Sequence, residues 1–188
     1  MRARRPVALL AATTLLSAFF LGVSVSAATT TTPAAGTASF FITPGGNGGG
    51  GTVVVTGAIG DYGKTTPEMN KNGKTNPKKG NYGKFVLQKG TIEANLTAFN
   101  AKEHSLGSQS SVNAATCSME ATGTAPVMLF NGTGLYKGIT GTVNLTVTFA
   151  IVLPFYTSGK NKGKCNESNN ANPVAQWGSI TGSGSVSF

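Results

Sequence analysis

Few side chains in this sequence have the type or the spacing that enzyme chemistry requires. The single histidine, His104, lies in the polar stretch 101–113, and we interpret it as a solvated side chain and not as a general base. No serine stands in a Gly-x-Ser-x-Gly motif, and the six carboxylates show no pair at a telling spacing. The sequence therefore predicts no particular catalytic residue.

Two glutamates fall on the polar positions of alternating strand patterns. Glu93 and Glu120 each alternate with apolar neighbours, which predicts that they lie on a solvated outer face. If the polar side of the sheet instead lined an interior cavity, both would be candidates for acid–base work. We expect the outer face.

Two cysteines, Cys117 and Cys165, stand far apart in the sequence. They lack the CxxC spacing of metal and redox sites, and a single histidine leaves too few ligands for a zinc site, so we expect no metal and no cofactor. An even count in an exported chain predicts a disulfide. It would close a loop of about fifty residues, which stabilises the fold by roughly 3–4 kcal/mol.

Aromatic side chains give the best candidates for a binding site. Phe155, Tyr156 and Trp177 flank a long loop, and Phe149 and Tyr136 lie in or beside the core segments. Core packing is the simpler interpretation of these rings. The sharper hypothesis is an apolar pocket at the mouth of a barrel that accepts a small hydrophobic ligand.

The first 27 residues read as a secretory signal peptide. Arg2, Arg4 and Arg5 precede an apolar stretch, 7–25, and Val25-Ser26-Ala27 supplies the small residues of a cleavage site. The alternative is an uncleaved membrane anchor, because the stretch is about long enough to span a bilayer. We expect cleavage, no transmembrane span afterwards, and a secreted or cell-envelope location.

The charge that remains after residue 27 is basic but carries no arginine. Because this part of the sequence contains 12 lysines and 6 carboxylates, the net charge of residues 28–188 is +6. The lysines cluster in loops rich in glycine and asparagine, and arginine forks for phosphates or bases are missing. We therefore expect no specific nucleic-acid binding, and consider attraction to anionic cell-envelope polymers as a partner class.

The composition divides the rest of the chain into an arm and a body. Residues 28–51 are rich in Thr, Pro and Gly, which predicts a flexible N-terminal arm in which the island Phe40-Phe41-Ile42 docks or adds a strand. Residues 52–188 form the expected body. Within it, 61–83 and 155–173 read as long polar surface loops, the first with a small hairpin at Asn72-Gly73.

Period-two alternation dominates the body and predicts an all-β fold. Strands are expected near 52–60, 84–100, 115–122, 127–130, 143–153 and 175–188, with a bulge or tight hairpin at Lys89-Gly90 and a turn at 123–126. No helix is expected. About seven or eight short strands with glycine corners predict a small antiparallel barrel, with a β-sandwich as the alternative. Gly182 and Gly184 favour the barrel, where inward positions taper.

The segment from Phe130 to Thr142 resembles the Gly-[Ser/Thr]-Gly-x-[Phe/Tyr]-x-Gly-x-x-Gly corner of the allene oxide cyclase and dirigent barrels. Gly132-Thr133-Gly134 through Tyr136, Gly138 and Gly141 carry the resemblance. The chain as a whole also resembles secreted actinobacterial proteins with such barrels. The resemblance implies an eight-stranded antiparallel barrel with a central cavity, and it brings no catalytic residue with it.

Three functions are consistent with these observations. The first is a secreted barrel that binds a small hydrophobic or amphiphilic ligand without converting it. The second is a cofactor-free cyclase or isomerase that acts by positioning its substrate in the cavity. The third is a structural or adhesion protein that holds anionic envelope polymers with its lysine loops. The scarcity of catalytic groups favours the first.

Overall fold

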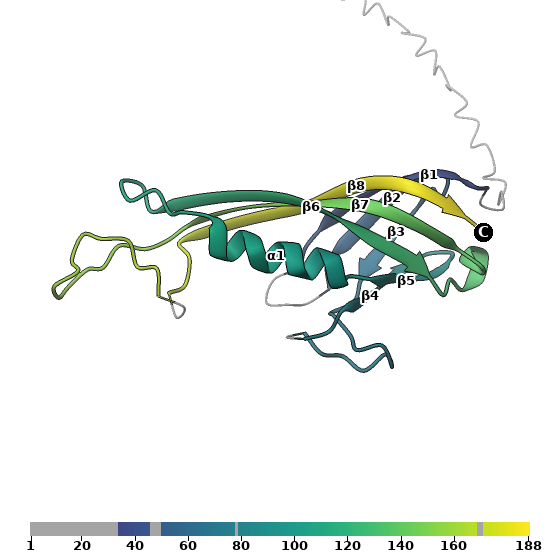
Figure 1. The fold of residues 1–188 in the computed structure, drawn as a ribbon, viewed down its shortest axis with the longest axis horizontal. Coiled ribbons are helices and arrows are strands. Elements are labelled where there is room, and N and C mark those ends of the chain that lie inside the picture. Colours follow the sequence, from purple (N-terminus) through teal and green to yellow (C-terminus); the bar gives the residue numbers. More distant parts are fainter. Residues whose placement is uncertain (1–33, 46–49, 78, 169–170) are drawn as a thin grey trace, which may run out of the picture. The chain divides into compact units, whose positions relative to one another are not determined.

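A closed antiparallel barrel of eight strands organises the protein (Figure 1). The computed structural model describes residues 34–45, 50–77, 79–168 and 171–188, all within one compact unit, Thr32–Phe188. The strands are β1 (Gly36–Thr43), β2 (Thr52–Gly57), β3 (Asp61–Thr65), β4 (Tyr82–Leu87), β5 (Gly90–Asn95), β6 (Ser118–Phe130), β7 (Thr140–Val152) and β8 (Ala175–Ser187). The predicted all-β barrel is thus confirmed, and the sandwich alternative is wrong. The predicted signal peptide lies outside the described residues.

Each strand pairs with the next along the chain, and β1 closes the barrel by pairing with β8. Phe40 stands opposite Val55 on β2 and Gly182 on β8. The prediction of a flexible arm over 28–51 is therefore wrong for Gly36–Thr43, whereas its alternative, an added strand, is right. The reason is physical: a barrel without β1 would leave the edges of β2 and β8 unpaired.

The core lies inside the barrel because alternate side chains on every strand point inward. Val53 and Val55 of β2 are buried while Val54 between them is half exposed. Across the interior, the rings of Phe40 and Phe85 lie 5.2 Å apart between centroids. The terminal alternation predicted for 175–188 is confirmed, since β8 pairs with β7 on one side and with β1 on the other.

One helix, α1 (Thr97–Gln109), packs against β6 (Figure 1). It covers β6 where this strand extends beyond β5, because β5 pairs with only the last three residues of β6, Met128–Phe130. Its side chains Phe99 and Leu106 are buried. The prediction that the chain contains no helix was therefore wrong. The 3.6-residue period is weak here because only these two large apolar side chains face the barrel.

Two further boundaries differ from the expectation. β6 runs through Gly123 and Pro126 without a turn, because both residues keep their alternating positions opposite Val147 and Asn144 of β7. β3 occupies the start of the predicted loop 61–83. The two alternatives at Lys89-Gly90 resolve as a tight hairpin between β4 and β5.

The glycine corner joins β6 to β7 through a short 3-10 turn, η2 (Gly134–Tyr136). Gly134 adopts a φ of 60°, and a Cβ there would collide with the carbonyl oxygen of Lys89. The backbone N–H of Thr133 donates to the carbonyl of Thr91 at 2.9 Å, which ties the corner to β5. The glycines serve this close approach of backbone to backbone.

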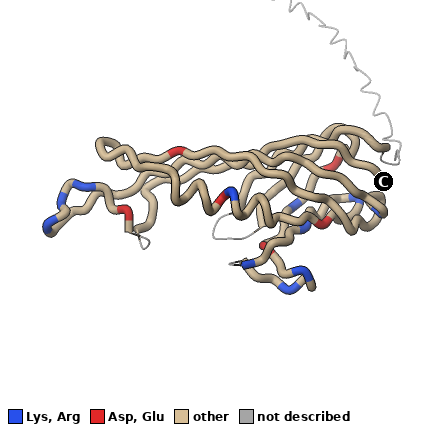
Figure 2. The backbone as a smooth tube through the Cα atoms, in the orientation of Figure 1, with Lys and Arg blue, Asp and Glu red and all other residues tan. Residues whose placement is uncertain are grey.

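The predicted disulfide between Cys117 and Cys165 is present, with Cα atoms 5.3 Å apart. It fastens the segment before β6 to the loop between β7 and β8. Lysines gather in that loop and in the loop between β3 and β4 (Figure 2). A small hairpin forms as expected in the loop between β3 and β4, where the N–H of Asn70 donates to the carbonyl of Lys74 at 2.9 Å.

Candidate functional site

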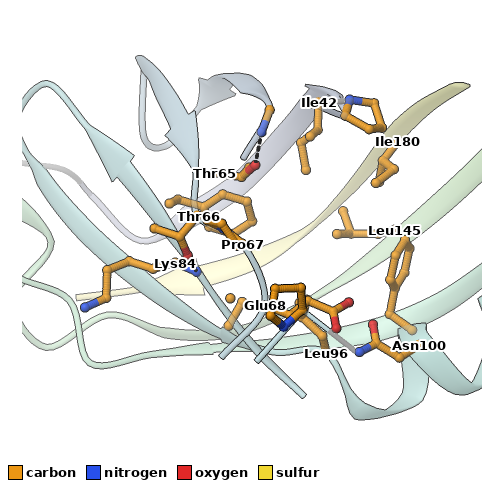
Figure 3. Close-up of a pocket in the computed structure, with 18 of the residues that line it drawn as sticks. Ile42, Thr65, Thr66, Pro67, Glu68, Lys84, Leu96, Asn100, Leu145 and Ile180 are labelled. Carbon is orange, nitrogen blue, oxygen red and sulfur yellow. Dashed lines mark hydrogen bonds between the residues drawn. The ribbon is translucent and has the colours of Figure 1, made fainter. Parts of the chain in front are cut away.

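A cavity of about 250 Å³ lies at the α1 end of the barrel (Figure 3). Its walls come from residues of β1, β3, β4, β5, β7 and β8, from the loops after β1 and β3, and from α1. The lining residues are Ile42, Pro44, Gly45, Gly51, Thr65, Thr66, Pro67, Glu68, Pro77, Gly83, Lys84, Phe85, Ala94, Leu96, Phe99, Asn100, Glu103, Leu145 and Ile180. Apolar side chains form most of this wall, and its polar side chains are Thr65, Thr66, Glu68, Lys84, Asn100 and Glu103. We call Glu68, Asn100 and Glu103, which also line the hollow beside α1, the polar wall.

Helix α1 brings two polar side chains to this wall. Its first turn is held by Asn95, whose side-chain oxygen accepts from the backbone N–H of Thr97 at 3.0 Å. Asn100 and Glu103 follow three residues apart, a spacing that places side chains on the same face of a helix. Phe99 anchors this end of the helix in the core.

Asn100 is 9% exposed and makes a fixed hydrogen bond on one side only. Its Nδ2 donates to the carbonyl oxygen of Gly80 at 3.0 Å. A carbonyl can only accept, so this bond sets which end of the amide faces Gly80. Among the buried side-chain nitrogen and oxygen atoms of the described residues, Asn100 Oδ1 alone has no hydrogen-bond partner.

Two carboxylates share the wall with this amide oxygen. Burial raises the pKa of Glu68, and the nearby charge of Glu103 raises it further, against smaller lowering effects of the Asn100 amide and His104. Desolvation also raises the pKa of Glu103, although much of this residue's surface is exposed, and His104 partly offsets the rise. Both acids hold their protons more tightly than a solvated glutamate does.

A second, wider hollow of about 960 Å³ adjoins the cavity. Glu68, Pro77, Asn100 and Glu103 line both. Its other basic side chains are Lys79 and His104. The polar wall is therefore reached from the outside through this hollow, while the apolar wall lies deeper in the barrel.

Lys84 also borders the cavity, but its charge is directed elsewhere. Its Nζ lies 3.2 Å from a carboxylate oxygen of Glu93, its cross-strand partner on β5. Figure 3 shows the Lys84 side chain extending away from Leu145 and Ile180. The cation is neutralised on the outer face of the sheet, where it leaves the two cavity acids unpaired.

The five aromatic residues proposed as a pocket lie outside this cavity. Tyr136 is fully buried, and its hydroxyl donates to Asp61. Phe149 is half-buried on β7 opposite Ala121. Phe155 and Trp177 are 46% and 61% exposed, and Tyr156 is half-buried in the loop after β7. None of the five is among the residues that line the cavity.

The remaining chemical candidates lie as follows. Glu93 and Glu120 are on the outer face, as expected, the first paired with Lys84 and the second exposed. His104 is exposed, also as expected, but it belongs to α1 and not to a loop. In the described part of the chain, no group of three or more His, Cys, Asp or Glu side chains is arranged to hold a metal ion.

Sequence reasoning missed Glu68, Asn100 and Glu103. The one available signal was the spacing of Phe99 and Leu106, which are two helical turns apart with Glu103 between them.

No described helix has the length and apolar content needed to cross a membrane. Comparisons with protein-family models, curated proteins and solved structures returned no match.

Proposed function

We propose that the protein is a secreted barrel that binds a small apolar or amphiphilic ligand in the cavity beside α1. The observation that carries this proposal is the cavity itself: about 250 Å³ of space with mostly apolar walls and a few polar side chains. Such a combination is typical of small-molecule sites, where the apolar wall supplies affinity and the polar groups set orientation.

The proposal also includes secretion of the protein and a relationship to a known family of barrels. The Cys117–Cys165 disulfide supports an oxidising compartment, consistent with the signal-like sequence at the N-terminus. The glycine corner joins two neighbouring strands, β6 and β7, of an eight-stranded barrel. This place in the fold supports a relationship to the allene oxide cyclase and dirigent barrels. The cavity is the part of that relationship on which the function rests.

Displacement of an environment-sensitive apolar dye tests ligand binding. Ile180 lines the cavity, and Thr181 beside it is exposed on the outer face of β8. We expect Ile180→Trp to fill the cavity and abolish dye binding, and Thr181→Trp to leave it intact. Native mass spectrometry of protein purified from its own secretion route would also reveal a retained ligand. A wild-type protein that binds no dye and retains no molecule contradicts the proposal.

A cofactor-free cyclase or isomerase is the second candidate, and the Glu68–Glu103 pair favours it. Two carboxyl groups with raised pKa values at a cavity wall are suited to giving and accepting a proton. The test is to incubate a ligand recovered from the protein with wild type and with Glu68→Gln and Glu103→Gln variants. Unchanged ligand in every sample argues for binding alone.

Attachment to anionic envelope polymers is a third candidate. It rests on the lysines of the two long loops, among them Lys71, Lys74, Lys160, Lys162 and Lys164 (Figure 2). Contacts of this kind weaken as salt rises. Retention on isolated cell walls at low salt, with release at high salt, would support it; release that is independent of salt would argue against it.

A further inference from the structure

We infer that the end of the protein formed by β7, β8 and the loop between them docks on an anionic lipid bilayer. Two groups of side chains carry this inference, and neither lines the cavity. The first, the apolar end cluster, consists of four large, exposed side chains: Val152, Phe155, Val174 and Trp177. The second, the lysine hairpin, is the segment 155–165, which holds Lys160, Lys162 and Lys164.

The apolar end cluster is exposed because β7 and β8 extend beyond β1. The first five residues of β8, Ala175–Ser179, pair with β7, whereas the pairing with β1 begins at Ile180. Trp177 stands opposite Ala150, and Val152 stands opposite Ala175. Val152 and Trp177 are therefore diagonal neighbours on one face of the sheet, the outer one. Their side chains meet water and not the core.

The other two members of the cluster lie next to this pair. The N–H of Val174 donates to the carbonyl of Val152 at 2.7 Å, and Val174 is 70% exposed. Phe155 follows three residues after Val152 and pairs with Cys165. Four of the nine large apolar side chains that are exposed in the described structure thus belong to this end. Exposed apolar patches with a polar rim mark surfaces that meet another molecule or a membrane.

The lysine hairpin adds positive charge beside the cluster. The N–H of Tyr156 donates to the carbonyl of Lys164 at 2.9 Å, and the disulfide of Cys165 fastens the base of the hairpin to the segment before β6. The three lysines are exposed, and Figure 2 shows lysines together at this end of the molecule. Residues 152–177 contain these lysines and one acid, Glu167, so their net charge is +2.

A bilayer takes up both groups of side chains, whereas other partners take up one. Tryptophan is enriched at membrane–water interfaces, and apolar side chains gain burial at the boundary of the acyl chains. Each lysine close to anionic headgroups strengthens binding roughly fivefold. A soluble polyanion would contact the lysines and leave the cluster in water. A second copy docked on the same end would bring its own lysines against them, and the like charges would repel.

Vesicle binding of the secreted form, residues 28–188, tests the inference. This form contains all eight strands, α1 and the disulfide, and it lacks the apolar stretch 7–25, whose own affinity for lipid would mask the result. Trp177 is the only tryptophan of the sequence, so the emission reports its surroundings directly. We expect cosedimentation with vesicles of equal parts phosphatidylcholine and phosphatidylglycerol, and a shift of the emission to shorter wavelength. Binding to phosphatidylcholine alone should be at least about tenfold weaker.

A matched pair of substitutions locates the apolar contact. Trp177→Ser should weaken cosedimentation with the mixed vesicles about tenfold or more, because a large ring no longer leaves water. Phe41→Ser is the control, since Phe41 is 50% exposed on β1 and lies outside the cluster. It should bind as wild type does. Equal binding of wild type and Trp177→Ser would contradict the inference.

A second pair locates the charge. Replacing Lys160, Lys162 and Lys164 by Gln should weaken binding at least about tenfold. The same replacement of Lys71, Lys74 and Lys79, exposed lysines of the β3–β4 loop, removes equal charge and should have a much smaller effect.

Three results would overturn the inference. The first is a lack of binding to the mixed vesicles, and the second is equal binding to phosphatidylcholine alone. The third is binding without a shift of the Trp177 emission that is abolished by about 1 M salt and matched by soluble polyaspartate. This third result would assign the lysines to polyanions in general. Dye binding in the cavity is independent of all three, so the proposed ligand-binding function is tested separately.

Discussion

The hydroxyl of Tyr136 donates a hydrogen bond to the carboxylate of Asp61 in the interior of the barrel, although 75 residues separate the two in the sequence. Asp61 also accepts from the backbone N–H groups of Tyr62 at 2.8 Å and Lys89 at 3.0 Å. One buried carboxylate thus joins the start of β3, the β4–β5 hairpin and the glycine corner. We regard it as the polar counterpart of the apolar core.

Removing the donor should destabilise the fold. Tyr136→Phe leaves the buried Asp61 carboxylate one hydrogen bond short, and we expect the free energy of unfolding to fall by about 1–3 kcal/mol. Tyr62→Phe is the control, because Tyr62 is 61% exposed, and should change stability by less than about 0.5 kcal/mol. Urea denaturation measures both. Equal effects of the two substitutions would show that the buried hydrogen bond adds nothing.

Asp61 also predicts how stability depends on pH. Burial raises the pKa of this carboxyl, but the hydrogen bonds from Tyr136, Tyr62 and Lys89 and the Lys89 charge outweigh it, so the pKa lies below its ordinary value of 3.8. The folded state therefore gains stability from Asp61 above pH 3.8, and loses it as the pH falls through the lowered pKa. We expect Asp61→Asn to flatten the acid limb of the stability profile. A variant that keeps the wild-type acid limb would assign it to other carboxylates.

Two glycines of β8 should respond differently to the same change. A Cβ at Gly182 would lie 2.8 Å from the Cα of Leu145 and closer still to the carbonyl oxygen of Asn144. A Cβ at Gly178 meets nothing nearer than 3.6 Å. Gly182→Ala should therefore destabilise the barrel by about 1–3 kcal/mol or more, since β7 must move away. Gly178→Ala should stay within about 0.5 kcal/mol. Thermal unfolding distinguishes them, and a neutral Gly182→Ala would mean that β7 and β8 are less closely packed.

The disulfide should stabilise the protein without serving the cavity. Replacing both Cys117 and Cys165 by Ala should lower the free energy of unfolding by about 3–4 kcal/mol, because the unfolded chain regains the freedom of the closed loop. Neither cysteine lines the cavity, so dye binding at low temperature should persist. Loss of binding in a folded double variant would place the loop after β7 in the site.

The two cavity acids, Glu68 and Glu103, should lower the stability of the folded protein at neutral pH. Desolvation raises the pKa of Glu68 and of Glu103, so their charged forms are disfavoured in the folded protein. Their contribution to stability is therefore present at low pH and falls as the pH rises through the raised pKa values. At neutral pH, Glu68→Gln and Glu103→Gln should modestly raise the melting temperature. A lower melting temperature in both variants would mean that the acids hold the fold together.

The alternation of apolar and polar residues was enough to predict the strands that bury a full face. β7 shows it because its inward side chains Val143, Leu145 and Val147 enter the common core, and Cys117 with Cys165 could be paired because no other cysteine competes. β3 was not predicted, because Asp61, Gly63 and Thr65 occupy its inward positions and none of them is a large apolar residue. Their burial depends on Tyr136 and on the backbone of β4, which lie elsewhere in the sequence.

Local sequence therefore determined the class of fold, the C-terminal strand β8 and the disulfide, since each follows from periodicity or from the number of candidate partners. Only the tertiary structure decided where the site lies. Glu68, Asn100 and Glu103 come together because β6 extends past β5 and α1 covers the gap. The periodicity of the sequence cannot predict that these three residues lie close together. Their position depends on how many residues of β5 and β6 pair, and on which face of α1 packs against the unpaired part of β6.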